Sequence, residues 1–278
     1  MYNFKAPLIG IRGSGDLATG VAHRLFKAGF PVIMTELANP RMVRRSVSMG
    51  EAVWEGLVCV EGVTAKLLSQ PLTQQELQGI LERQYVGVVV DPEAKSFEQL
   101  RIKFEVDARM LKKELHDQRR PDHFIIGLGP GFVAGENIDC VVETMRGITL
   151  GQVITKGSPI ANTGVPGVVG GESLRRLLKA PKSGIFKACA KLGDLVRAGD
   201  TVAYVDDEPV KVLIDGKLRG LIRTGTLVKE REKVGDCDPR GESVDIYTIS
   251  DKARAIGGGV LEAVVSQIWR QLAISNEQ

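Results

Sequence analysis

The spacing of apolar residues in the first half of the chain alternates between two periods. Residues 8–11 and 32–35 are short apolar runs, whereas apolar side chains between residues 17 and 28 recur every three or four positions. The runs predict buried strands, and the wider spacing predicts a helix with one face in the core. Apolar runs at 85–91 and 124–126 continue the pattern. Strands that alternate with helices indicate an α/β domain built on a parallel sheet.

The second half of the chain contains an internal repeat. Residues 184–206 and 216–238 align with an offset of 32, so that glycines, leucines, valines and a final aspartate coincide. Each copy predicts two short strands around a turn, and neither copy could bury its apolar face alone, so we expect the copies to pair. Duplicated units of this size resemble the barrel-sandwich hybrid of biotinyl and lipoyl carrier domains.

A carrier domain presents a lysine on the hairpin between its halves, and this chain lacks that turn. The joining segment, 206–211, ends in Lys211, two positions after Pro209. Because proline fixes φ and removes a donor, Lys211 is expected to begin the next strand. Lys252 occurs in an Asp-Lys-Ala tripeptide, but outside both copies. We therefore expect no lipoyl or biotinyl group on either lysine.

These patterns predict the fold class and three regions. We expect an α/β, Rossmann-like domain over residues 1–179 that is extended by glycine-rich loops. An all-β, barrel-sandwich-hybrid-like domain is expected over residues 180–249. Residues 250–278 contain a glycine triplet followed by apolar residues at helical spacing. This spacing predicts a C-terminal helix that packs back on the first domain.

Composition limits the classes of protein and partner. With 278 residues, 43% of them hydrophobic, 26% charged and a net charge of +3, we expect a globular chain of about two domains that can form a homo-oligomer. The small net charge argues against nucleic acid and membrane surfaces as partners. No apolar run approaches the about 20 residues that cross a bilayer, and the first residues do not resemble a signal peptide, so the expected location is the cytoplasm. The four cysteines and three histidines lack metal-ligand spacing, which predicts reduced thiols and no bound metal.

A glycine turn follows the first predicted strand and opens the first predicted helix. Its pattern, Gly13-x-Gly15-x-x-Ala18, with Glu36 at the end of the second strand, fits the dinucleotide-binding fingerprint. Glycines let the backbone approach a pyrophosphate, the helix N-terminus attracts it, and the acid can hold a ribose. The residues expected to contact a cofactor here are Arg12, Gly13, Ser14, Gly15, Asp16, Leu17, Ala18, Gly20 and Glu36.

A structural explanation of the same turn stays open. Asp16 lies in the first helical turn, where a carboxylate suits the helix dipole and would repel a bound phosphate. Arg12 would offset this repulsion. In this explanation the glycines only allow the strand and the helix to pack closely.

A second glycine-rich region follows the apolar run at 124–126. Gly127, Gly129 and Gly131 place donor-rich backbone at the carboxyl end of a strand, where open α/β sheets bind ligands. Residues 143–171 are rich in glycine and poor in charge, which indicates ordered strands and turns that build a pocket wall. The further candidates for cofactor binding are Arg146, either as an anion-binding group or in a structural salt bridge, Thr163 and Gly164.

Several motifs along nearly the whole chain resemble one protein family. They are Arg-Gly-Ser-Gly-Asp-Leu-Ala-Thr-Gly at 12–20, the Glu36, Pro40, Arg44 and Arg45 series, Ile-Gly-Leu-Gly-Pro-Gly-Phe at 126–132, Glu-Thr-x-Arg-Gly at 143–147, Thr-Gly-Val-Pro-Gly at 163–167 and Asp-Lys-Ala-Arg-Ala-Ile-Gly-Gly-Gly at 251–259. They are similar to the YqeB-type family, called selenium-dependent molybdenum hydroxylase system proteins. The resemblance implies an accessory role in maturing a molybdenum hydroxylase, alongside XdhC-type proteins, which also carry a Rossmann-like domain. Met145 and Ile148 depart from the family pattern by replacing polar residues.

Three hypotheses for the function follow, and none assigns a catalytic residue. The first is a maturation factor that binds a molybdopterin-type cofactor or its dinucleotide in a glycine-lined cleft, with the hydroxylase apoprotein as partner. The second is an NAD-dependent oxidoreductase, although no catalytic set accompanies the fingerprint. The third is a scaffold without catalytic activity that docks the hydroxylase.

Overall fold

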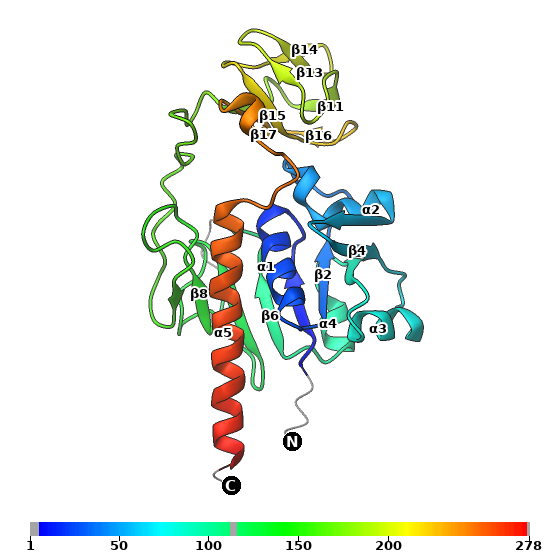
Figure 1. Cartoon of the computed structure of the whole chain (residues 1–278), viewed down its shortest axis with the longest axis vertical. Helices are drawn as coiled ribbons and strands as arrows, with labels where there is room; N and C mark the ends of the chain where they lie inside the picture. Colours follow the sequence, from blue (N-terminus) through cyan, green and yellow to red (C-terminus); the bar gives the residue numbers. More distant parts are fainter. Residues whose placement is uncertain (1–5, 112–115, 277–278) are drawn as a thin grey trace. The chain divides into compact units, whose positions relative to one another are not determined.

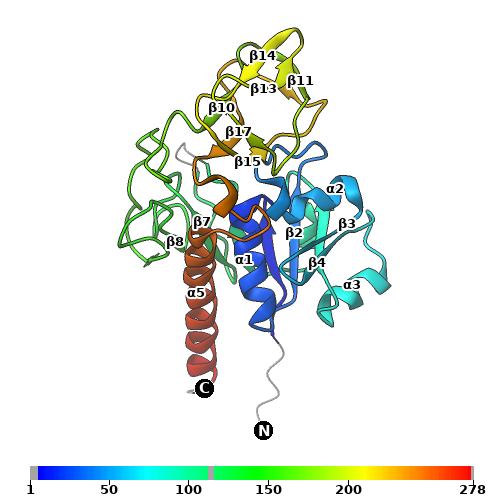
Figure 2. The same cartoon turned by 45° about the horizontal axis from the view of Figure 1, so that its top comes forward.

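The chain forms two compact units, each made of segments that are separate in sequence. The computed structural model describes residues 6–111 and 116–276. Unit one comprises residues 1–38, 49–162 and 249–278, and unit two comprises residues 39–48 and 163–248. The boundaries expected from the sequence lay after residues 179 and 249. Figures 1 and 2 show the elements of each unit.

Unit one is built on one nine-stranded sheet. The strand order is β3-β4-β5-β2-β1-β6-β7-β8-β9. The strands from β4 to β8 run parallel to their neighbours, whereas β3 and β9 pair antiparallel at the two edges. The bounds are β1 Ile9–Arg12, β2 Val32–Glu36, β3 Leu57–Val60, β4 Val63–Leu67, β5 Val86–Val90, β6 Phe104–Asp107, β7 Phe124–Leu128, β8 Cys140–Val142 and β9 Val153–Ile154.

Two long helices pack against each other in unit one. Both views show α1 (Asp16–Lys27) beside α5 (Asp251–Asn276). The helices are so close that only glycine fits at two positions of their contact. A Cβ at Gly20 would lie 2.7 Å from Ala253, and one at Gly257 would lie 2.7 Å from the Gly20 carbonyl oxygen. The shorter helices are α2 Ala52–Glu55, α3 Gln74–Leu81 and α4 Lys95–Gln99, with a 3₁₀ turn at Met49–Glu51.

Unit two consists of two four-stranded antiparallel sheets. Their strand orders are β10-β17-β15-β12 and β14-β13-β11-β16. The predicted repeat is visible as three strands per copy, because β11, β12 and β13 recur as β15, β16 and β17. Strands exchange between the copies, since β11 pairs with β16 and β12 pairs with β15. The bounds are β10 Leu177–Lys179, β11 Gly184–Ala188, β12 Leu195–Val196, β13 Thr201–Val205, β14 Glu208–Lys211, β15 Gly216–Leu221, β16 Leu227–Val228 and β17 Lys233–Asp238, with 3₁₀ turns at Arg45–Val47 and Gly241–Ser243.

A short segment from the first part of the chain completes unit two. The Val43 carbonyl accepts a 2.8 Å hydrogen bond from the Leu221 N–H, and Ser46 donates its hydroxyl to the Ile246 carbonyl at 2.6 Å. A Cβ at Gly220 would lie 2.6 Å from the Val43 side chain. Residues 39–48 are therefore held by the second unit although they follow β2 directly in sequence.

The predicted fold class is wrong. The strand, helix and strand of residues 9–36 are present, but they belong to a large mixed sheet with antiparallel edges and not to a Rossmann-like domain. Unit two is a pair of antiparallel sheets that recruits β10 and β14 in addition to the repeat, and it is not a barrel-sandwich hybrid. The reason is that periodicity identifies a buried run, while long-range pairing decides its direction and its neighbours.

Within residues 6–111 and 116–276, no helix is both long enough and apolar enough to cross a membrane. α5 is long, but it carries polar and charged residues throughout its length.

Candidate functional site

The glycine turn after β1 is fixed by Glu36 at the end of β2. Ser14 donates its backbone N–H and its hydroxyl to one Glu36 carboxylate oxygen, at 3.0 and 2.7 Å. The other oxygen accepts from the Leu37 N–H at 2.8 Å. Gly13 has a φ of +93°, which favours glycine, and donates to the Thr35 carbonyl at 2.9 Å. Glu36, predicted to hold a ribose, is therefore engaged by the turn itself.

The same turn places a glycine, which has no side chain for capping, at the N-cap of α1. Gly15 is the N-cap residue and contributes no capping hydrogen bond. Asp16 begins the helix and Leu17 follows, both half-buried, at the carboxyl edge of the parallel strands. Ala18 is buried, and Gly20 permits the close approach of α5. The predicted set thus divides into residues 13–17 at the sheet edge and two residues that pack the helix.

Lys252, in the first turn of α5, is the most unusual group at this edge. It is partly buried, and among the described residues it forms no hydrogen bond or ion pair. Burial lowers the pKa of Lys252, while Asp16 raises it, Arg146 lowers it and Glu143 raises it. The N-terminal turns of α1 and α5 and the segment after β8 therefore meet around an amine to which the described residues offer no hydrogen bond or ion pair. The sequence prediction considered Lys252 only as an attachment site and missed this environment.

Arg146 and Glu143 hold the segment after β8 in place. Arg146 forms a two-pronged ion pair with Asp251 at the start of α5, at 2.6 and 2.8 Å. The buried Glu143 carboxylate accepts the N–H groups of Met145 and Ile160, at 2.6 and 2.7 Å. Of the two roles considered for Arg146, the structure displays the salt bridge.

The second glycine loop lies mainly in the core. A Cβ at Gly127 would lie 2.5 Å from the Phe132 ring, and Gly131 is buried. Gly129 has a φ of +94° and turns the chain beside Thr144. Thr163 and Gly164 belong to unit two, where the Thr163 hydroxyl accepts from the Val165 N–H at 3.2 Å and Gly164 has a φ of +69°. The residues predicted to bind the cofactor are therefore divided between the two units.

A charged cavity of about 290 Å³ lies beside β1 and β6. Arg12 lines it, and burial, followed by Arg109, lowers the pKa of Arg12. The Arg12 Nε atom is buried and has no hydrogen-bond partner among residues 6–111 and 116–276. Glu105 and Asp107 also line the cavity and were not predicted, although two acids spaced by two on one strand share a face of the sheet. The other lining residues are Glu93, Ala94, Glu98, Asp117, Gln118, Arg119, Arg120 and Ile125.

Ion pairs neutralise much of the charge in this cavity. Asp107 accepts from Arg109 Nε at 2.9 Å, and Glu105 pairs with Arg120. Burial raises the pKa of Glu105, although Arg120 opposes this effect. In the part of the chain that the structure describes, no group of three or more His, Cys, Asp or Glu residues could hold a metal ion.

Solved structures offer only weak similarities. A succinylglutamate desuccinylase/aspartoacylase from Rhodobacter sphaeroides is 22% identical over 33% of this chain and 31% of that chain, with a TM-score of 0.23. An aspartoacylase family protein from Mesorhizobium loti is 14% identical over 84% of this chain and 85% of that chain, with a TM-score of 0.26. Scores of this size carry no argument about activity or substrate, and the strand topology alone describes the fold.

The chain resembles a curated protein in sequence much more strongly than it resembles these solved structures. No protein-family model matches the chain. The chain is 45% identical over 270 residues to "Uncharacterized protein YqeB" of Escherichia coli (strain K12), which covers 97% of this chain and 49% of that protein. The chain thus spans about half the length of the curated relative that it matches. With this identity over nearly all its residues, the chain belongs to the YqeB family.

Proposed function

We propose that this chain binds an anionic, nucleotide-type ligand at the carboxyl edge of unit one, as an accessory protein of a molybdenum hydroxylase. The ligand would be a molybdopterin-type cofactor or its dinucleotide. The observation that carries the proposal is the partly buried Lys252, which forms no hydrogen bond or ion pair among the described residues. It lies at the edge where the Gly13–Gly15 turn opens α1.

The chemistry of this edge favours a phosphate group. A helix N-terminus presents backbone N–H groups without intrahelical partners, and Gly15, the N-cap residue of α1, has no side chain that could cap them. A bound anion would accept from these groups and would also neutralise Lys252. The Asp16 carboxylate opposes an anion, so Lys252 has the further role of offsetting that charge. Anion binding would raise the pKa of Lys252, because an opposite charge favours the protonated amine.

The surrounding groups suit holding a ligand better than transforming one. Glu36 and Glu143 accept N–H groups from their own chain and so are already engaged. Burial raises the pKa of Cys140 to about 12 and that of Cys237 to about 11, so neither thiol is a ready nucleophile at neutral pH. These features support a binding and delivery role, and the motif resemblance at residues 12–20 and 251–259 suggests the hydroxylase as client.

The proposal can be tested by deletion and complementation. A strain that lacks the whole protein should contain hydroxylase polypeptide at normal abundance, with normal iron-sulfur content but little activity. Its active site should lack molybdenum, sulfur or selenium, while other molybdoenzymes work normally. Wild-type protein and Lys27→Met should restore activity, because Lys27 is an exposed lysine at the other end of α1. Lys252→Met should not.

The ligand itself is identified from the purified proteins. Small molecules extracted from wild type should include a molybdopterin-type compound that is depleted by at least about tenfold in folded Lys252→Met. Fully loaded hydroxylase in the deletion strain would contradict the proposal. Extraction of NAD would favour an oxidoreductase, and co-purified hydroxylase without any small molecule would favour a docking scaffold.

A further inference from the structure

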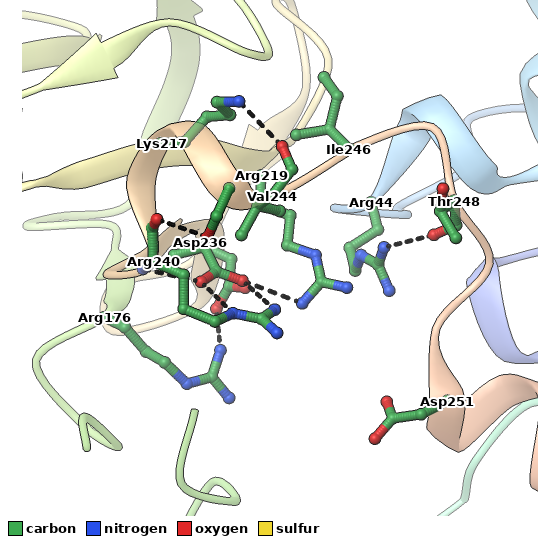
Figure 3. Close-up of polar contacts among 12 residues, drawn as sticks. Arg44, Arg176, Lys217, Arg219, Asp236, Arg240, Val244, Ile246, Thr248 and Asp251 are labelled. Atoms are coloured by element: carbon green, nitrogen blue, oxygen red, sulfur yellow. Dashed lines mark hydrogen bonds and ion pairs between the residues drawn. The ribbon is translucent and has the colours of Figure 1, made fainter. Parts of the chain in front are cut away.

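Unit two contains two buried carboxylates on its last repeat strand. Asp236 and Asp238 of β17 are 3% and 1% exposed. Arg240 binds Asp238 through Nη2 at 2.8 Å, and Arg219 of β15 binds the same carboxylate through Nη1 at 3.1 Å. Arg176, which precedes β10, pairs with Asp236. Figure 3 shows the guanidinium groups of Arg176, Arg219 and Arg240 gathered around Asp236.

Positive charge exceeds negative charge in this cluster. A fourth guanidinium, that of Arg44, is held by the Thr248 carbonyl at 3.5 Å and lies near Arg219 in Figure 3. Burial lowers the pKa of Arg219, and Arg44 lowers it further before Asp238 raises it. Lys233 adds another cation 3.6 Å from Asp236. The two carboxylates therefore pair with three guanidinium groups and one amine, and the Arg44 guanidinium lies beside that of Arg219.

Two of these arginines also have a donor without an acceptor. The Nε atoms of Arg176 and Arg219 are buried and find no hydrogen-bond partner in the described part of the chain, and both side chains are only 12% exposed. A buried N–H group without an acceptor costs free energy. The two aspartates thus leave one donor of Arg176 and one of Arg219 without an acceptor among the described residues.

The repeat shows that the sheet does not require this cluster. With the offset of 32, Arg219 corresponds to Lys187 and Asp236 corresponds to Tyr204. Lys187 and Tyr204 are exposed residues opposite each other on β11 and β13. The same strands therefore form in the first copy without buried arginine pairs, so the cluster needs an explanation other than folding.

We propose that Arg44, Arg176, Arg219 and Arg240 form a binding site for a phosphate or pyrophosphate group. A planar guanidinium donates two parallel hydrogen bonds to such an oxyanion. The aspartates hold the arginines in place, and a bound phosphate group supplies further negative charge. This site lies wholly within unit two and does not depend on the ligand proposed for unit one.

The test is calorimetric titration of the full chain with inorganic phosphate, pyrophosphate and ADP. Pyrophosphate should bind wild type, and Arg219→Gln should weaken its binding by at least about tenfold. Lys187→Gln, which removes the same charge at the equivalent position of the other copy, should bind as wild type does. ADP that binds no tighter than pyrophosphate would show that the site recognises phosphate groups alone.

A second variant protects the test against misfolding of Arg219→Gln. Arg240→Gln removes one guanidinium but leaves Asp238 paired with Arg219, so its thermal unfolding should remain cooperative while its pyrophosphate affinity falls several-fold. The proposal is overturned if pyrophosphate gives no binding heat with wild type at millimolar concentration. It is equally overturned if folded Arg219→Gln and Arg240→Gln both bind as wild type does.

Discussion

The two units differ in whether their partly buried, positively charged side chains are paired with carboxylates. In unit one, Lys252 is partly buried, and no hydrogen bond or ion pair to it occurs among the described residues. In unit two, Arg176, Arg219 and Arg240 are paired with buried aspartates. A desolvated charge without a partner costs stability and is typical of a functional group. Paired arginines are held in position before a ligand arrives. The comparison therefore predicts that removing charge has opposite effects on stability in the two units.

The largest effect is expected from Asp238→Asn in unit two. Removing this carboxylate leaves Arg219 and Arg240 partly buried without their common partner. Breaking a buried pair in this way should lower the free energy of unfolding by about 3–5 kcal/mol. Asp206→Asn changes the equivalent residue of the first copy, which is exposed and accepts from the Ile185 N–H at 2.9 Å. This control should lose at most about 1 kcal/mol. Equal losses in urea unfolding would contradict a special role for the cluster.

The pH dependence of the free energy of unfolding should show whether Asp238 stabilises unit two through its charge. Burial alone would raise the pKa of Asp238, but the hydrogen bonds and charges of Arg240 and then Arg219 outweigh it, so the pKa is lowered. The contribution of Asp238 is therefore fully present above the unfolded pKa of about 4 and is lost as pH falls through the folded pKa. Unfolding curves of wild type and Asp238→Asn should converge in that acid range. A difference that stays constant from neutral pH downward would show that Asp238 acts through shape and not through charge.

The sequence predicted local elements better than their assembly. The apolar runs identified β1, β2, β5 and β7, and the 32-residue offset identified paired strand units. It could not identify the antiparallel edges β3 and β9, because pairing direction depends on contacts between distant segments. The transfer of residues 39–48 to unit two was also hidden, since the Val43 to Leu221 hydrogen bond joins residues far apart in the chain.

Prediction from the sequence was limited in the same way for single residues of the candidate site. The fingerprint located the Gly13–Gly15 turn, but in the structure one Glu36 oxygen accepts from Ser14 of that turn and the other accepts from the Leu37 N–H. Lys252 carries no local signal of its environment, because its burial depends on the packing of α5 against α1. Glu105 and Asp107 could have been noticed as acids with strand spacing near the carboxyl end of β6.

The smallest effect, and the one of opposite sign, is expected from Lys252→Met. Methionine keeps the length and the helix propensity of the side chain while removing a charge that burial disfavours. Without ligand, the variant should be more stable than wild type by about 0.5–1 kcal/mol at neutral pH. Lys27→Met, at an exposed position, should change stability by no more than about 0.5 kcal/mol.

The pH dependence identifies the cause of that gain. The pKa of Lys252 is lowered chiefly by burial, so the unfolded chain binds more protons than the folded chain between the folded pKa and the unfolded value of about 10.4. Wild-type stability should therefore rise relative to Lys252→Met as pH increases through this window, and the advantage of the variant should shrink. Chemical unfolding at a series of alkaline pH values measures this difference. A variant that is less stable than wild type at every pH would mean that Lys252 has a stabilising partner, and the contrast between the two units would then fail.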